Sequence, residues 1–364
     1  MGSGPSSDAR ERHTPKVVLV TGASRFFGGS VASRLAATPG VTRVIAVDTM
    51  TPSREQRRRM GDAEFVRADI RNPLIRKVVE AAGIDTVVHA TVLSRPPSGG
   101  GRAAMKDLNV LATMQLLAVC QKAPSVRRVV VRSSSAVYGC SAKDPAKFTE
   151  EMSARTPPSG WFARDMIDIE ALVRGMARRR PDISASILRF APIVGPRLAG
   201  RGVQYLRSPI TPTVLGREAR LQLLHEEDAV AVLVHAALRA SGGTVNVAGD
   251  GALAMSQAIR RAGRIVVPVP LFLFRTAGRT LMGPVMRGFS GEQPDYFHFG
   301  CGLDTTRMRT ELGFTPRWTS VQAFDDLIAG AALRPVFDPA WIDAAENKLL
   351  GLIGAGTGAH TWHT

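Results

Sequence analysis

Cysteine, aromatic residues and metal-binding motifs are all scarce in this chain. Its 364 residues contain three cysteines, Cys120, Cys140 and Cys301. Their odd number and irregular spacing argue against a disulfide framework or a cysteine metal site, and they favour a reducing compartment. The seven histidines form no metal-ligand motif, so we expect no metal. Aromatic residues make up only 6% of the chain and no DNA- or RNA-reading motif is present, which argues against a nucleic-acid partner.

Long hydrophobic runs are also absent. The longest apolar run, 265–274, is broken by Pro268 and Pro270 and is shorter than the ~20 residues that a membrane span needs. Residues 1–14 lack the apolar core of a signal peptide, so we expect a disordered leader there and a cytoplasmic protein. In the segment 271–285 apolar residues recur at helical spacing among arginines, which favours core packing and leaves peripheral membrane contact open. The sequence also leaves a homodimer open.

The dominant charged residue is arginine. The formal net charge is +16, and no lysine lies between Lys147 and Lys348. Guanidinium groups suit phosphates because their N–H donors match the phosphate oxygens in geometry. The charge could attract an anionic lipid or a phosphorylated ligand, although a solvated basic surface explains it more simply.

Short β-branched runs alternate with longer helical stretches through the first half of the chain. We therefore predict an α/β fold of the Rossmann type, with a doubly wound parallel sheet, over residues 15–190. Further along the pattern becomes irregular, and we expect a smaller C-terminal substrate-binding lobe over 191–330, interleaved with the first domain. Residues 331–364 should form a C-terminal helix, at 338–352, and a mobile tail. The expected strands are Val17–Val20, Val44–Val47, Glu64–Val66, Thr86–His89, Val129–Val131, Ser186–Leu188 and Val245–Val247.

A glycine turn follows the first expected strand. Gly22 permits a tight turn, and Gly28 lets the next helix pack closely on the sheet, which brings a dinucleotide diphosphate to the helix N-terminus. Arg25 replaces the middle glycine of this pattern, and Ser24 and Phe27 complete the turn. The sequence therefore predicts a dinucleotide site with an added cation.

Charges of both signs bear on the choice of dinucleotide. Asp48 ends the next strand about 20 residues past Gly28, where a carboxylate binds the adenosine ribose hydroxyls and repels a 2′-phosphate. Arg25 and Arg57–Arg59 could instead pair with a 2′-phosphate. We expect NAD, with NADP as the less favoured alternative.

Further motifs follow in order along the chain. Asp69 and Ile70 come after the third strand, Ala90 after the fourth, Asn109 lies on the next helix, and 133–139 reads Ser-Ser-Ser-Ala-Val-Tyr-Gly. Later matches are 188–196, 225–230, 243–249 and 304–316. Together these motifs resemble the extended short-chain dehydrogenase/reductase family, the NAD-dependent epimerases and dehydratases of nucleotide sugars such as UDP-glucose 4-epimerase.

The resemblance implies roles for particular residues. Ser134 takes the position of the catalytic hydroxyl, and Asp228 is the expected N-cap of a helix. On the substrate side, Pro192 replaces an Asn of the family, and Arg220 lies one residue before Leu221, which aligns with a common diphosphate-binding Arg. The implied cofactor-binding residues are Gly22, Ser24, Arg25, Phe27, Gly28, Asp48, Asp69, Ile70, Ala90 and Asn109.

The two residues that carry proton transfer in that family are missing. Phe162 and Met166 stand where it has Tyr and Lys. That Tyr exchanges a proton with the substrate, and the Lys lowers its pKa. Phe162 has no ionisable proton and Met166 no charge. Asp165 and Asp168 could supply a replacement base, or they could belong to a solvated helix face.

Two functional hypotheses follow. The first is an atypical protein of the epimerase/dehydratase family that binds NAD and acts on, or only binds, a phosphorylated or nucleotide-linked small molecule. The second is a non-catalytic NAD-sensing or scaffold protein whose second lobe contacts a protein or membrane partner. The sequence leaves open whether the protein is an enzyme.

Overall fold

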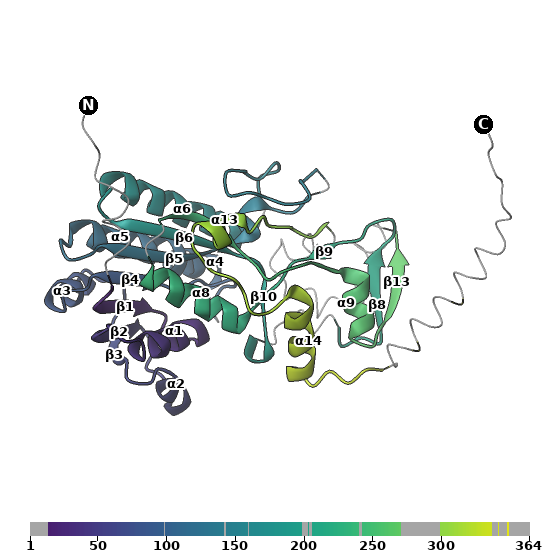
Figure 1. The fold of residues 1–364 in the computed structure, drawn as a ribbon, viewed down its shortest axis with the longest axis horizontal. Coiled ribbons are helices and arrows are strands. Elements are labelled where there is room, and N and C mark those ends of the chain that lie inside the picture. The colour runs from purple at the N-terminus through teal and green to yellow at the C-terminus, as the bar shows by residue number, and fades with distance from the viewer. Residues whose placement is uncertain are drawn as a thin grey trace.

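A parallel sheet covered by helices on both faces dominates the computed structural model (Figure 1). The structure describes residues 14–97, 99–141, 143–158, 160–198, 203, 206–239, 242–270, 299–336, 341 and 348. These residues form one seven-stranded sheet with a smaller lobe beside it. The predicted Rossmann-type fold class is confirmed.

The strands lie across the sheet in the order β11-β6-β5-β4-β1-β2-β3, and every neighbouring pair is parallel. The winding reverses between β1 and β4, and ligands of open α/β sheets bind outside the carboxyl ends of the strands at such a point. The strands are β1 (Val17–Thr21), β2 (Arg43–Asp48), β3 (Glu64–Arg67), β4 (Thr86–His89), β5 (Arg128–Ser134), β6 (Ser184–Phe190) and β11 (Gly243–Val247). All seven predicted strands are present, and most are slightly longer than predicted. The apolar runs of the central strands β1, β2, β4 and β5 suit strands that are buried on both faces.

Helices pack on the two faces of the sheet. α1 packs against α8 on one face, and α5 packs against α6 on the other (Figure 1). The helices of this domain are α1 (Phe26–Ala36), α2 (Arg54–Arg59), α3 (Leu74–Ala81), α4 (Gly101–Lys106), α5 (Ala112–Lys122), α6 (Trp161–Arg179) and α8 (Glu226–Leu238). A π-helical segment, Asp107–Leu111, joins α4 to α5.

The predicted N-cap of α8 is wrong by three residues. His225 is the N-cap, and its Nδ1 accepts the N–H of Glu227 at 3.2 Å. Asp228 lies in the first helical turn instead. Its carboxylate accepts the N–H groups of Arg317 at 3.0 Å and Trp318 at 2.9 Å, so it fastens a distant loop to the helix. That long-range pairing competes with local capping and cannot be seen in the local sequence.

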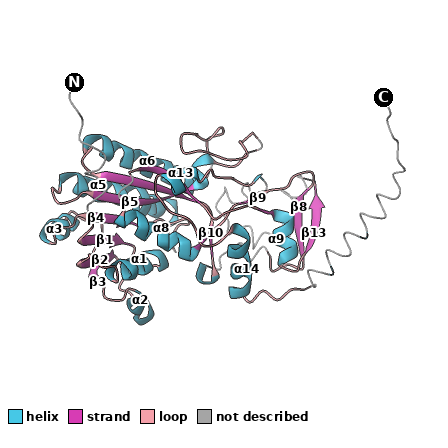
Figure 2. Cartoon of the chain, in the orientation of Figure 1, coloured by secondary structure: helices cyan, strands magenta, loops and turns pink. Residues whose placement is uncertain are grey.

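The smaller lobe is made of short elements (Figure 2). Although they follow several of these elements in the chain, α8 packs on the main sheet domain and β11 is a strand of the main sheet. A second hydrophobic cluster of ten buried residues, including Leu206, Leu221 and Phe324, forms its core. Its paired strands are β7 (Ile193–Val194) with β10 (Leu224–His225), β8 (Ile210–Val214) with β13 (Ile265–Val269), and β9 (Arg220–Leu221) with β12 (Leu253–Ala254). Its helices are α9 (Met255–Arg261) and α14 (Ser320–Gly330), and the short α13 (Thr306–Thr310) contacts β11. A 3₁₀ turn, Pro196–Leu198, packs against α14.

One helical stretch, Gly101–Lys122, is long and apolar enough by length and composition to cross a bilayer. Half of its apolar window is buried inside the protein, and it carries the fully buried polar residues Asn109 and Thr113. Those features suit a core helix packed on the sheet. The predicted leader, the segment 271–285 and the C-terminal helix at 338–352 lie almost wholly outside the described residues.

Candidate functional site

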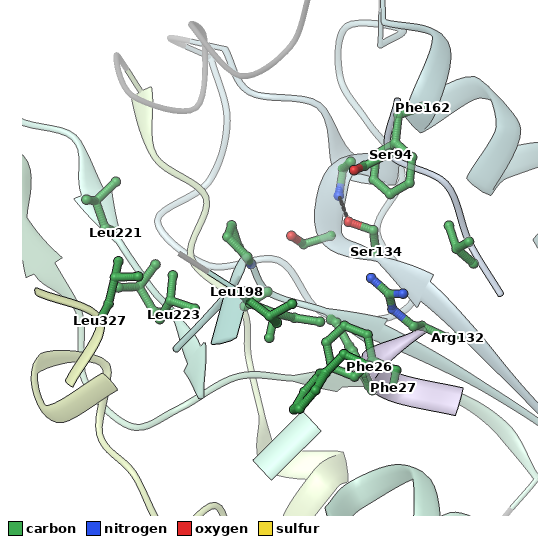
Figure 3. Close-up of a pocket in the computed structure, with 18 of the residues that line it drawn as sticks. Phe26, Phe27, Ser94, Arg132, Ser134, Phe162, Leu198, Leu221, Leu223 and Leu327 are labelled. Carbon is green, nitrogen blue, oxygen red and sulfur yellow. Dashed lines mark hydrogen bonds between the residues drawn. The ribbon is translucent and has the colours of Figure 1, made fainter. Parts of the chain in front are cut away.

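A cavity of about 720 Å³ lies between the carboxyl ends of the sheet strands and the lobe (Figure 3). Sites for small molecules typically measure ~300–1,000 Å³. The predicted site residues that line it are Ser24, Arg25, Phe27, Ser134, Phe162 and Pro192. Outside the lining lie Gly22, Gly28, Asp48, Asp69, Ile70, Ala90, Asn109, Met166 and Arg220. The structure therefore brings the turn, the end of β5 and the start of α6 together around one space.

The glycine turn has the geometry that the sequence predicts. Gly22 has a φ of +77°, and a Cβ there would stand 2.5 Å from Thr91 Oγ1. A Cβ on Gly28 would come within 2.2 Å of the Gly22 carbonyl oxygen, so α1 packs directly on the turn. Arg25 is the N-cap of α1 and makes no side-chain capping bond. The first amides of α1 are thus not capped by this side chain.

Asp48 ties the end of β2 to this turn. Its Oδ2 accepts the N–H of Ser24 at 3.0 Å, and its Oδ1 accepts the N–H of Met50 at 3.3 Å. The Ser24 hydroxyl donates to the Met50 carbonyl at 2.7 Å. The carboxylate stands beside the turn, close to where the sequence predicts contact with an adenosine ribose.

One end of the cavity carries positive charge. Arg25, Arg59, Arg95 and Arg132 line it, and no Asp or Glu is among its described lining residues. Arg59 pairs with Glu55 at 3.0 Å. The other three arginines have no carboxylate partner in the described part of the chain. This end therefore attracts anions.

Arg132 is a cavity residue to which the family motifs do not point. Its Nε is buried and has no hydrogen-bond partner among the residues that the structure describes. Its guanidinium carbon lies 4.6 Å from the centre of the Phe27 ring, a cation–π contact. Burial, assisted by the nearby charge of Arg25, lowers the pKa of Arg132 to about 10. The available signal in the sequence is a cation between the buried run Val129–Val131 and Ser133.

Of the two positions of the missing proton carriers, one lines the cavity near Ser134 and the other lies in the core. Ser134 Oγ accepts the N–H of Ala136 at 3.2 Å and caps the 3₁₀ turn Ser135–Tyr138. Phe162, in the first turn of α6, is half-buried and lines the cavity. Met166 is fully buried in the main hydrophobic core. The side chain at the lysine position is thus a packing residue.

The two aspartates considered as replacement bases lie outside the cavity lining. Asp165 is fully buried and accepts two hydrogen bonds from Arg102, at 2.7 and 2.5 Å. It also accepts one from Asn109 Nδ2 at 3.0 Å. Asp168 is exposed on α6. The structure gives no support to either residue as a base.

Asn109 and Asp69 are engaged within the protein. Asn109 accepts the N–H of Leu93 at 2.8 Å and donates to the Leu93 carbonyl at 2.9 Å, so it holds the loop after β4. Asp69 pairs with Arg71, with Nη2–Oδ2 at 2.6 Å. The hydrogen bond from Arg71 holds the pKa of Asp69 below its usual value. In this structure Asn109 acts as a loop-positioning residue.

His89, at the end of β4, is fully buried and is hydrogen-bonded at both ring nitrogens. Thr21 Oγ1 lies 2.9 Å from its Nδ1, and Thr113 Oγ1 lies 2.8 Å from its Nε2. Thr113 donates its one hydroxyl proton to the Asn109 carbonyl, so it must accept from Nε2–H, and Nδ1 accepts from Thr21. Burial lowers the pKa of His89 to about 4. His89 is therefore neutral at physiological pH.

Acid should destabilise the protein through His89. Because its pKa falls from 6.5 to about 4 on folding, the unfolded chain takes up the proton first as the pH drops. The stabilisation is complete above pH 6.5 and is lost progressively as the pH falls toward about 4, by up to roughly 3 kcal/mol. Urea unfolding across this window should show a shallower loss for His89→Gln. An equal pH dependence of the two proteins would contradict this assignment.

The opposite end of the cavity is apolar. Figure 3 shows Leu221, Leu223 and Leu327 across the cavity from Arg132, with Leu198 between them and Phe26. Leu221 and Leu223 also belong to the core of the lobe. Arg220, which was predicted to bind substrate, is exposed on β9 and lies outside the lining. The cavity is therefore amphipathic.

Comparison with known proteins identifies the family. The chain matches the model of the NAD dependent epimerase/dehydratase family over residues 18–248. The chain belongs to this family. The matched span runs from the second residue of β1 to the residue after β11, so it includes the seven-stranded sheet except Val17.

Relatives cover nearly the whole length of this epimerase/dehydratase family member. An uncharacterized protein of Mycobacterium tuberculosis is 53% identical over 338 residues, which are 93% of this chain and 90% of that protein. The Bordetella bronchiseptica enzyme WbmG, solved in complex with NAD, aligns with a TM-score of 0.66 at 16% identity, covering 90% of this chain and 97% of WbmG. UDP-glucose 4-epimerase of Thermotoga maritima, solved with UDP-glucose, gives a TM-score of 0.64 at 17% identity, covering 87% of this chain and 98% of that enzyme. At these identities the two structures establish the shared fold.

Proposed function

We propose that this protein binds NAD and a second, phosphorylated or nucleotide-linked small molecule, without the Tyr–Lys proton transfer of its family. The observation that carries the proposal is the pair of cations, Arg25 and Arg132, beside the uncapped start of α1. Neither guanidinium has a carboxylate partner in the described part of the chain, and the Nε of Arg132 is buried without a hydrogen bond, which is unfavourable in the free protein. A diphosphate bound there would supply the missing negative charge.

The cavity suits a dinucleotide at one end, and at the other it lacks the Tyr and Lys that carry proton transfer in the family. The turn at Gly22 and Gly28, the amides of α1 and the orphaned Nε of Arg132 suit a diphosphate. Asp48 beside the turn favours NAD over NADP. NAD, when bound, supplies hydride transfer, and Ser134 could orient a substrate hydroxyl or carbonyl.

Replacing Arg132 should separate binding from stability. We expect Arg132→Met to weaken NAD binding ten- to hundredfold, since charge-assisted hydrogen bonds contribute ~1.5–3 kcal/mol. The same change should raise the melting temperature of the free protein, because it removes an uncompensated cation. Isothermal titration calorimetry and thermal unfolding measure the two effects.

Arg178→Met is the matched control, because Arg178 is exposed on α6 and lies outside the cavity. Equal NAD affinity in both variants would contradict the proposed diphosphate site.

Titration of the unmodified protein with NADP tests the role of Asp48. Tighter binding of NADP than of NAD would show that the arginines govern the choice between the two dinucleotides.

The alternative is a protein that binds NAD as a sensor or scaffold without turnover. Phe162 and Met166 favour it, and the described lining of the cavity contains no carboxylate or histidine to act as a base. Cycling between NAD and NADH, followed by the absorbance of the reduced nicotinamide, distinguishes an enzyme from a sensor.

A further inference from the structure

Among the residues that the structure describes, those lining the lobe end of the cavity form a wall without polar side chains. Its described lining there includes Leu198, Leu206, Leu221, Leu223, Met255 and Leu327. Every other described lining residue from 190 onward is also apolar or cysteine. Among the described lining residues, hydroxyl and amide side chains lie at the opposite end, in the serines and the glutamine of the turn region, the loop after β4 and the end of β5.

Polar side chains near this wall are already engaged or turned away. Gln222 lies between two lining leucines, but its amide donates to the Gly249 carbonyl at 3.2 Å and accepts the N–H of Leu303 at 2.7 Å. Buried Ser320 donates to the Gly251 carbonyl at 2.9 Å. Arg220 is exposed. None of them is left to bind a sugar hydroxyl in the cavity.

This wall would bind a hydrocarbon more favourably than a hexose. Each sugar hydroxyl buried there would lose its water without gaining a partner, which is unfavourable. A hydrocarbon of similar size would gain from leaving water in proportion to its buried area. The wall therefore selects against the sugar end of a UDP-hexose.

We infer that the second ligand is an amphipathic phosphate, with a hydrocarbon body against the lobe leucines and its phosphate toward Ser134 and Arg95, which the proposed NAD site does not use. The guanidinium of Arg95 complements such a head group, and the apolar end of the cavity complements the hydrocarbon body. This inference rests on the proposed function, because it assigns the turn end of the cavity to NAD. It narrows the second ligand from a phosphorylated or nucleotide-linked small molecule to an amphipathic phosphate.

Binding of the apolar dye Nile red tests the wall directly. The dye should bind the unmodified protein saturably with a blue-shifted emission, and Leu198→Gln should weaken its binding about tenfold. Leu198 is half-buried and packs against the main hydrophobic core, so thermal unfolding of this variant is the control for folding. Leu215→Gln is the control, because Leu215 is 59% exposed and lies outside the cavity.

Competition on the unmodified protein gives a second test that needs no variant. Geranyl phosphate should displace the dye, and UDP-glucose should not. Displacement by UDP-glucose, or equal dye affinity in the Leu198 and Leu215 variants, would overturn the inference. NAD titrated into Leu198→Gln should bind as it does to the unmodified protein. Failure of NAD to bind both the unmodified protein and Leu198→Gln would refute the proposed function. The dye results would still test whether the apolar wall binds a hydrocarbon.

Discussion

Neither the unmodified protein nor its Phe162→Tyr, Met166→Lys double variant should interconvert UDP-glucose and UDP-galactose above background when NAD is supplied. General acid–base catalysis contributes on the order of 10²–10⁴-fold in rate, and the unmodified chain has neither the acid nor the cation that tunes it. Restoring both groups is not sufficient, because substrate must bind before chemistry can occur.

The structure gives two physical reasons why the double variant should fail. Met166 is fully buried in the core, so a lysine there would be desolvated and its pKa lowered, which weakens its effect on Tyr. Pro192 and Leu221 line the cavity where the family places polar substrate contacts. The cavity offers a UDP-hexose no partner at those positions.

The assay is direct quantification of the two sugar nucleotides after incubation with NAD. Thermal unfolding of the double variant is the control for folding. Turnover by the double variant would show that the sugar pocket is intact, and it would contradict the apolar-wall inference as well. Turnover by the unmodified protein would reveal a base other than Asp165 and Asp168, both of which lie outside the cavity.

The fold could be predicted because its signals are local. The runs Val17–Val20 and Val129–Val131 are mostly β-branched and, apart from the half-buried Val17, fully buried, and the glycine turn needs Gly22 for its positive φ. Parallel strands and turns of this kind can be predicted from residues that are adjacent in the sequence. The start of α8 was less predictable because Asp228 serves the backbone of Arg317, far away in the chain.

The cavity was harder to predict because its character arises from contacts between distant segments. Arg132 matters because the fold places it beside Arg25 and leaves its Nε unpaired. Asp165 could serve as a base by its residue type, but Arg102, 63 residues away, holds its carboxylate. The apolar wall joins turns and strands of the lobe that no single motif covers.

A buried ionic network lies directly behind the cavity, centred on Glu170 of α6. Its carboxylate accepts the Ser133 hydroxyl at 2.7 Å and two bonds from Arg189, at 2.9 and 2.7 Å. Arg189 also donates to the Tyr138 hydroxyl at 2.7 Å. Burial opposes ionisation, but Arg189 and Ser133 hold the pKa of Glu170 below its usual value. The network joins α6, β5 and β6 at the base of the cavity.

Removing the carboxylate of Glu170 should therefore cost far more than removing one of its partners at the surface. Glu170→Ala leaves Arg189 buried without a counter-charge, and breaking such a pair costs about 3–5 kcal/mol. Arg174 also binds Glu170, at 2.9 Å, but its side chain is 45% exposed, so Arg174→Ala should cost under about 1 kcal/mol. Urea unfolding of the two variants measures the difference. Similar losses of unfolding free energy in the two variants would mean that water, or a shift of β6, solvates the charge of Arg189. A large loss in Glu170→Ala alone would show that this network stabilises the end of β5 and with it the position of Ser134.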